Sequence, residues 1–223
     1  MTTGALLAGV DEVGRGAIAG PVVAGACVLT AKLEKHAGDP PWWSPKDCPE
    51  VRIADSKILT PDERELSAAW IRNHSHWALG WSSAEDIDAL GILCATEKAM
   101  QEAVATVRGL CEVTALLVDG RDKFWFDLPH MSIIKGDQTE PAIAAASIVA
   151  KVARDEWISD QGAVHPGYGF GDHKGYGTPD HQAALKQLGP CPLHRQTFLH
   201  ADSSKPRARR RPSTPAPSAP ALA

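Results

Sequence analysis

The sequence lacks the features that define several large classes of protein. None of its apolar runs approaches the roughly 20 residues of a membrane-spanning helix, and no basic segment precedes an apolar one near Met1. Its five cysteines are odd in number and include no CxxC pair, which argues against a disulfide framework or a zinc knuckle. We therefore expect a cytoplasmic protein without a membrane anchor, structural disulfides or structural zinc.

A surplus of positive charge is also missing. The 223 residues have a formal net charge of -4, although the tail from Ser203 to Ala223 holds five basic residues and no acidic one. Residues 1 to 202 therefore carry 18 basic and 27 acidic residues. Bulk charge does not attract a polyanion to such a domain, so a nucleic-acid ligand would need a local basic patch or metal ions. The tail is rich in proline, alanine and arginine, and we expect it to be disordered and to contact nucleic acid weakly.

The hydrophobic pattern is typical of an α/β protein. Apolar runs at 5–13 and 21–29 predict two buried strands joined by a glycine-rich turn, and further strands are predicted at 76–82, 113–118 and 131–135. The predicted helices cover 61–73, 92–107, 142–160 and 179–188. Thr139 is expected to cap the third helix, and Glu34 to Pro49 is expected to be an exposed excursion. This order predicts a mixed five-stranded sheet flanked by helices, followed by a small C-terminal region of helices and loops.

Four carboxylates occupy positions that such a sheet brings together. Asp11 and Glu12 end the first strand, Asp119 ends the fourth, and Asp155 lies on the long helix. Because neighbouring strand ends share a crevice that a packed helix can overlook, we expect the four side chains to converge. Like charges this close repel one another, and oxygen-only ligands suit a hard cation, Mg²⁺ or Mn²⁺. Two such ions support phosphodiester hydrolysis, whereas turn-forming or capping aspartates are the structural alternative.

Other polar residues allow a functional and a structural interpretation. Lys57 and Lys174 are candidate phosphate contacts, and solvated lysines are the alternative. Asp137 is expected to cap or turn the chain rather than to bind metal. Histidines and one cysteine after Asp160 have partial metal-ligand spacing, but their loop setting favours packing or phosphate contacts. These residues are His165, His173, His181, Cys191 and His194.

Six motifs, in order along the chain, resemble the ribonuclease HII family of type 2 ribonucleases H. They are D-E-V-G-R-G-A-I-A-G-P at 11–21, D-S-K at 55–57, V-D-G at 118–120, K-G-D at 135–137, A-A-A-S-I-V-A-K-V-A-R-D at 144–155 and G-Y-G-F-G-D-H-K-G-Y-G-T at 167–178. The resemblance covers residues from about 5 to 200. It implies a ribonuclease H-like fold, with a catalytic domain at 1–202 whose segment 161–202 binds substrate.

The resemblance also implies roles for individual residues. The residues that match the family's metal-binding catalytic carboxylates are Asp11, Glu12, Asp119 and Asp155. Gly14, Arg15 and Gly16 match the element that recognises the 2′-hydroxyl of a ribonucleotide, and Tyr176 matches a tyrosine that stacks on the following deoxyribose. Glycines beside Arg15 suit that task, because they let the backbone approach a sugar closely.

The activity implied is that of a metal-dependent endonuclease. It would cut the RNA strand of RNA/DNA hybrids, and would also cut on the 5′ side of a single ribonucleotide in duplex DNA, as in ribonucleotide excision repair. The expected products carry a 3′-hydroxyl and a 5′-phosphate, the cofactor is Mg²⁺ or Mn²⁺, and the enzyme is expected to be a monomer.

The sequence allows three other interpretations. A dinucleotide-binding fold is disfavoured, because Gly14, Gly16 and Gly20 have the wrong spacing and Pro21 opens a strand instead of a helix. Type 3 ribonuclease H is disfavoured by G-R-G, since that group usually has G-K-G and an additional N-terminal domain. A non-catalytic nucleic-acid-binding protein of the same fold, acting through the arginine-rich tail, stays open as the alternative function.

Overall fold

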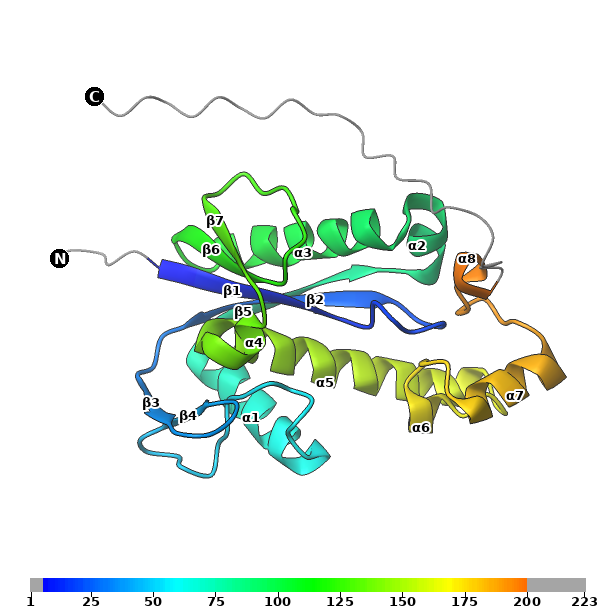
Figure 1. Ribbon diagram of the computed structural model, residues 1–223, viewed down its shortest axis with the longest axis horizontal. Helices are drawn as coiled ribbons and strands as arrows, with labels where there is room; N and C mark the ends of the chain where they lie inside the picture. Colours follow the sequence, from blue (N-terminus) through cyan, green and yellow to red (C-terminus); the bar gives the residue numbers. More distant parts are fainter. Residues whose placement is uncertain (1–5, 200–223) are drawn as a thin grey trace.

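The computed structural model describes residues 6–199, in which five strands form one mixed sheet (Figure 1). The strands are β1 (Leu6–Val13), β2 (Val22–Leu29), β5 (Ser75–Ser82), β6 (Val113–Asp119) and β7 (His130–Ile133). Their order across the sheet is β5-β2-β1-β6-β7. β2 pairs antiparallel with β1 and β5, whereas β6 pairs parallel with β1 and β7. The predicted mixed five-stranded sheet is confirmed.

Helices cover both faces of this sheet (Figure 1). One face packs against α3 (Ile92–Arg108), which follows α2 (Ala84–Leu90), and buries its apolar side in one cluster with β1, β2 and β6. The other face packs against α5 (Pro141–Val164), next to α1 (Pro61–His74) and α4 (Gly136–Thr139). Three short helices gather at the end of the molecule that carries the β1–β2 turn: α6 (Phe170–His173), α7 (Pro179–Leu188) and α8 (Gln196–Leu199).

Small residues let α5 lie directly on β1 and β2. A Cβ atom on Gly9 would lie 2.1 Å from the carbonyl carbon of Ala142, and one on Gly25 would lie 2.3 Å from the carbonyl oxygen of Ala146. Real Cβ atoms do not approach so closely, so any larger residue would push the helix off the sheet. The close contact fixes the helix that carries Asp155 relative to the strand that carries Asp11.

One local prediction was wrong, and a second, of an exposed segment at 34–49, holds for all but three of its residues. Thr139 ends the short helix α4, and α5 begins after Glu140 with Pro141 in its first turn, so proline at this position starts the helix without a side-chain cap. The excursion at 34–49 overlaps the hairpin of β3 (Leu33–His36) and β4 (Trp42–Pro45). Trp43 in that hairpin is 5% exposed and packs in the core cluster that holds Ile53, with which its backbone also pairs. The tail at 203–223 lies outside the described residues.

Candidate active site

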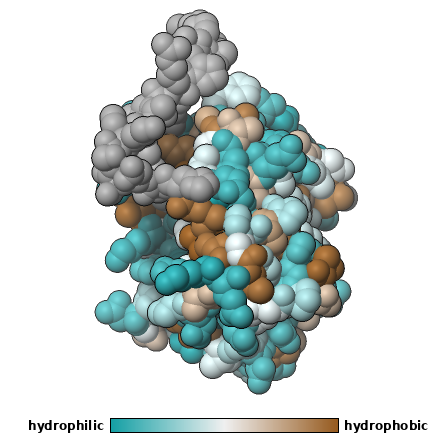
Figure 2. All heavy atoms as spheres, turned by 90° about the vertical axis from the view of Figure 1, so that its right-hand side faces the viewer, coloured by the Kyte–Doolittle hydropathy of each residue, from teal (hydrophilic) through white to brown (hydrophobic). Residues whose placement is uncertain are grey.

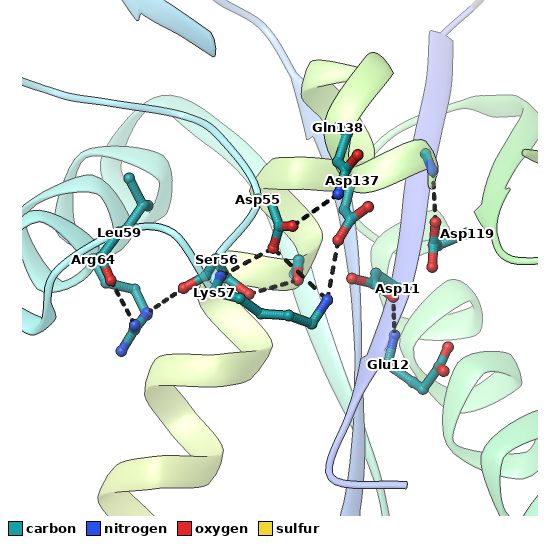
Figure 3. Close-up of polar contacts among 12 residues, drawn as sticks. Asp11, Glu12, Asp55, Ser56, Lys57, Leu59, Arg64, Asp119, Asp137 and Gln138 are labelled. Carbon is teal, nitrogen blue, oxygen red and sulfur yellow. Dashed lines mark hydrogen bonds and ion pairs between the residues drawn. The ribbon is translucent and has the colours of Figure 1, made fainter. Parts of the chain in front are cut away.

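The acidic side chains of two parallel strands lie close together at the carboxyl end of β1. The register pairs Val10 with Val118, so Asp11 and Asp119 follow at the same level of the sheet. Asp11 is buried, and Figure 3 shows Glu12, Asp119 and Asp137 around it. The backbone N–H of Gly136, at the start of α4, donates to Asp119 Oδ1 at 2.6 Å and fixes that carboxylate.

Burial and mutual repulsion act on this cluster. Burial raises the pKa of Asp11 well above its ordinary value, and the charges of Glu12 and Asp119 raise it further. Burial also raises the pKa of Glu12, although the guanidinium of Arg15, 3.0 Å away, opposes that shift. Arg15 is shared with Asp122 at 2.9 Å, so it supplies only part of the missing positive charge.

The chemistry of these side chains fits a hard divalent cation. Their donor atoms are all oxygen, and their charges disfavour one another unless a cation lies between them. In the described part of the chain, however, no three His, Cys, Asp or Glu side chains are gathered tightly enough to hold a metal ion as they stand. A bound cation would therefore have to draw the carboxylates closer together.

Asp155 is engaged elsewhere. Its carboxylate forms an ion pair of 2.7 Å with Lys151, one turn earlier on α5. The carboxylates that raise the pKa of Asp11 are instead Glu12, Asp119 and Asp137. The structure thus brings three of the four predicted acids together, and Lys151 would have to release Asp155 before it could join them.

A second network beside Asp11 was not anticipated from the sequence. Lys57 reaches Asp137 Oδ2 at 3.2 Å and Asp55 Oδ1 at 3.7 Å, while the amide of Gln138 donates to Asp55 (Figure 3). Asp137 and Asp55 are buried, whereas the Lys57 side chain is 75% exposed. Asp137 is more than a turn former, because its charge also raises the pKa of Asp11. Its position after a strand and a glycine, as in K-G-D, was the available signal.

The turn after β1 lies against the loop that carries Tyr176. Gly14 is buried with a φ of 91°, and a Cβ there would lie 2.1 Å from Arg154 Nε, so only glycine fits. The backbone N–H groups of Ile18 and Ala19 both donate to the carbonyl of Gly175. The half-buried ring of Tyr176 is covered by cations, with its centroid 5.4 Å from Arg154 Cζ and 5.9 Å from Lys151 Nζ.

The ammonium of Lys174, a predicted phosphate contact, is hydrogen-bonded within the protein. It donates to Ser159 Oγ at 2.5 Å and to the carbonyl of Gly171 at 2.6 Å. The residue has a positive φ of 51°, so the loop backbone turns sharply here. The lysine therefore ties the loop to α5.

The histidines after Asp160 form packing contacts. His173 stacks on His181 at 4.1 Å between ring centroids, and His181 Nε2 lies 3.1 Å from His194 Nε2. Cys191 Sγ lies 3.2 Å from His194 Nδ1, but this pair belongs to no metal-binding group within residues 6–199. His165 is outside the stack. In the same residues, no helix is both long and apolar enough to cross a membrane.

Comparison of the chain with known proteins agrees with these observations. The model of the ribonuclease HII family matches residues 8–201. The curated ribonuclease HII of Nitrosococcus oceani is 46% identical over 196 residues, which cover 87% of this chain and 89% of that protein. That of Halorhodospira halophila is 45% identical over 193 residues, covering 85% and 90% respectively.

Solved structures show the same fold. The chain matches the structure of the PCNA:RNase HII complex from Archaeoglobus fulgidus with a TM-score of 0.66 at 23% identity, covering 94% of this chain and 98% of that one. It matches ribonuclease H2 from Pyrococcus horikoshii with a TM-score of 0.62 at 24% identity, covering 86% and 93%. The family match and the curated relatives confirm the prediction of a metal-dependent ribonuclease, and the chain belongs to the ribonuclease HII family.

Proposed function

We propose that this chain is an endonuclease that hydrolyses the RNA strand of RNA/DNA hybrids and cuts 5′ of a single ribonucleotide in duplex DNA. The observation that carries the proposal is the group of Asp11, Glu12 and Asp119 beside a glycine turn in which Gly16 is exposed. Acids that raise one another's pKa favour a bound cation, and backbone that is accessible at Gly16 can test a sugar for its hydroxyl.

Each group has a distinct task in this proposal. Asp11, Glu12 and Asp119, joined by Asp155 once Lys151 releases it, would hold two Mg²⁺ or Mn²⁺ ions. The ions would supply the charge needed to activate a water and to stabilise the leaving 3′-oxygen, so that the products would carry a 3′-hydroxyl and a 5′-phosphate. A divalent ion is supported by one structure of similar fold, Bst-RNase HIII in complex with Mn²⁺, which is 15% identical with a TM-score of 0.56.

The substrate would be bound by the turn and the neighbouring loop. The backbone of Gly14, Arg15 and Gly16 would test for the 2′-hydroxyl, and the ring of Tyr176 would stack on the next deoxyribose. Lys57 would contact a phosphate near the acids. A monomer in the cytoplasm that acts in ribonucleotide excision repair is part of the same proposal.

Cleavage of matched duplexes tests this function. One duplex carries a single ribonucleotide, a second is an RNA/DNA hybrid, and a third is all DNA, and each is incubated with Mg²⁺, Mn²⁺ or EDTA. We expect one cut 5′ of the ribonucleotide, cleavage of the hybrid, an intact all-DNA duplex and no reaction in EDTA. Equal cutting of all three duplexes would contradict the substrate, and cutting in EDTA would contradict the metal.

A further inference from the structure

Two consecutive residues between α7 and α8, His194 and Arg195, connect both elements proposed to read the substrate. They are 2% and 0% exposed, and neither lies in one of the six motifs that carry the family resemblance. Arg195 contacts the turn after β1, and His194 reaches the loop of Tyr176 through His181. This end of the molecule faces the viewer in Figure 2, where apolar residues gather near the middle of the face.

Arg195 is held by backbone carbonyl groups. Its Nε donates to Gly20 O at 2.9 Å, its Nη1 to Arg15 O at 3.1 Å and its Nη2 to Gly14 O at 2.8 Å. Among the described residues it forms no salt bridge with a carboxylate, and burial lowers its pKa to about 9. Burial of a cation is unfavourable, and here all three of its hydrogen bonds go to the carbonyl groups of one turn, which fixes that turn.

These hydrogen bonds set the direction of two N–H groups. The peptide bonds that follow Gly14 and Arg15 are trans, so the C=O and the N–H of each point in opposite directions. Because both carbonyls face Arg195, the N–H groups of Arg15 and Gly16 face away from it. Neither N–H has a hydrogen-bond acceptor within residues 6–199, and Gly16 is exposed with open space around its Cα. Arg195 therefore holds two N–H groups that have no acceptor in this part of the chain on the far side of the turn from itself.

A directed chain of hydrogen bonds starts at His194. Burial lowers the pKa of His194 and favours its neutral ring; because the backbone N–H of Cys191 donates to Nδ1 at 3.0 Å, we assign the ring proton to Nε2. At the other end, the carbonyl of Tyr176 can only accept, so His181 donates to it from Nδ1 at 2.9 Å. His181 Nε2 then accepts from His194 Nε2 across 3.1 Å. Each neutral ring donates from one nitrogen and accepts at the other, and the last hydrogen bond of the series is the one to the backbone carbonyl of Tyr176.

We propose that His194 and Arg195 form a positioning element, which holds the turn at Gly14–Gly16 and the backbone of Tyr176 in one fixed arrangement. The inference rests on the proposed function of those two elements. Because the two residues are adjacent, a shift of one reading element is transmitted to the other through a single peptide unit. Selectivity for the ribonucleotide therefore depends on a segment that need not touch the substrate.

Binding without divalent cations tests this arrangement apart from catalysis. The affinity for a duplex with one ribonucleotide is compared with that for the same duplex with a deoxyribonucleotide, by fluorescence anisotropy in EDTA. We expect Arg195→Gln to reduce the preference of the wild type about tenfold, since two oriented donors are lost. Arg195→Lys should not restore it, because an ammonium cannot bridge the three carbonyls.

Two further variants separate positioning from folding. His194→Phe keeps the ring that packs on Tyr168 and Phe170 but removes both nitrogens, and we expect it to raise KM more than it lowers kcat. Ile71→Ala, in the core between α1 and α5, is the control that lowers stability without changing the preference. Hydrogen exchange should become faster at residues 14–20 in Arg195→Gln and stay unchanged there in Ile71→Ala.

The outcomes distinguish the two proposals. If the wild type binds both duplexes equally, the proposed sugar test fails and the positioning element fails with it. Alternatively, the wild type prefers the ribonucleotide, while Arg195→Gln and Arg195→Lys fold and keep both that preference and slow hydrogen exchange at 14–20. That result overturns only the positioning element. If Arg195→Gln does not fold, His194→Phe and Arg195→Lys decide in the same assay.

Discussion

The acids at the end of β1 and the arginines behind the following turn treat buried charge in opposite ways. Asp11 and Glu12 lie among like charges, and burial raises the pKa of both. Arg154 and Arg195 are fully buried as well, yet each donates three hydrogen bonds to carbonyl oxygens. The buried carboxylates repel one another and so favour a bound cation. The buried guanidinium groups donate to backbone carbonyls instead and so fix the position of that backbone.

The largest effect on kcat is expected when a carboxylate of the acidic cluster is replaced. Asp119→Asn keeps the size of the side chain, but its uncharged amide is a poor ligand for a divalent ion. We expect kcat on the ribonucleotide duplex to fall by about 100- to 1000-fold or more. Steady-state kinetics give the value, and anisotropy in EDTA should show nearly unchanged substrate binding.

Asp127→Asn is the matched control for this substitution. Asp127 pairs with Arg108 at the surface, and its side chain is 58% exposed. Its replacement should leave kcat within about twofold of the wild type. Activity that persists in Asp119→Asn would favour the alternative of a binding protein whose cleavage comes from a contaminant.

The cluster of Asp11, Glu12 and Asp119 should destabilise the folded protein when no cation is present. The folded-state pKa of Asp11 lies above its unfolded value, so this group stabilises the fold at low pH and that contribution is lost as the pH rises. At neutral pH, Asp11→Asn should therefore raise the Tm of the metal-free protein, on the order of a few degrees. Differential scanning fluorimetry in EDTA measures it.

Addition of Mg²⁺ or Mn²⁺ provides the converse measurement. A cation that binds only the folded state raises the Tm of the wild type, and this rise should be smaller in Asp11→Asn. A metal-free Tm that falls in the variant would mean that the carboxylate stabilises the fold and that the proposed repulsion is absent.

The histidine chain beside the arginines should respond to acid. Burial lowers the pKa of His181 to about 4, so the folded state binds fewer protons than the unfolded state between about pH 4 and 6.5. Stability from this group is present above pH 6.5 and is lost as the pH falls towards 4, the opposite sign to Asp11. His181→Gln should flatten the fall in Tm across that window, relative to the wild type. An unchanged slope would mean that the fall has another origin.

The sequence predicted the acids better than the arginines for a physical reason. Strand ends are visible as apolar runs, so the proximity of Asp11 and Asp119 follows from two local patterns and the parallel pairing of their strands. The partners of Arg195 are carbonyl groups of residues about 175 to 181 positions away, and carbonyls leave no mark on a sequence. The ion pair of Lys151 with Asp155 was visible as an i, i+4 spacing, but the choice between that pair and the acid cluster depends on packing.

The smallest effect on activity is expected at Lys57, which lies beside the acidic cluster. Its side chain is 75% exposed and pairs with buried Asp137, so Lys57→Met should change kcat and KM by only about two- to fivefold.

The salt dependence of substrate binding separates the two interpretations of Lys57. If Lys57 contacts a phosphate, the slope of log binding constant against log salt should fall in magnitude by about one. If it only neutralises Asp137, the slope stays the same and the metal-free Tm falls, because a buried carboxylate loses its partner. Lys98→Met is the control, since Lys98 pairs with Asp86 at 2.9 Å on the opposite face of the sheet and should change neither quantity.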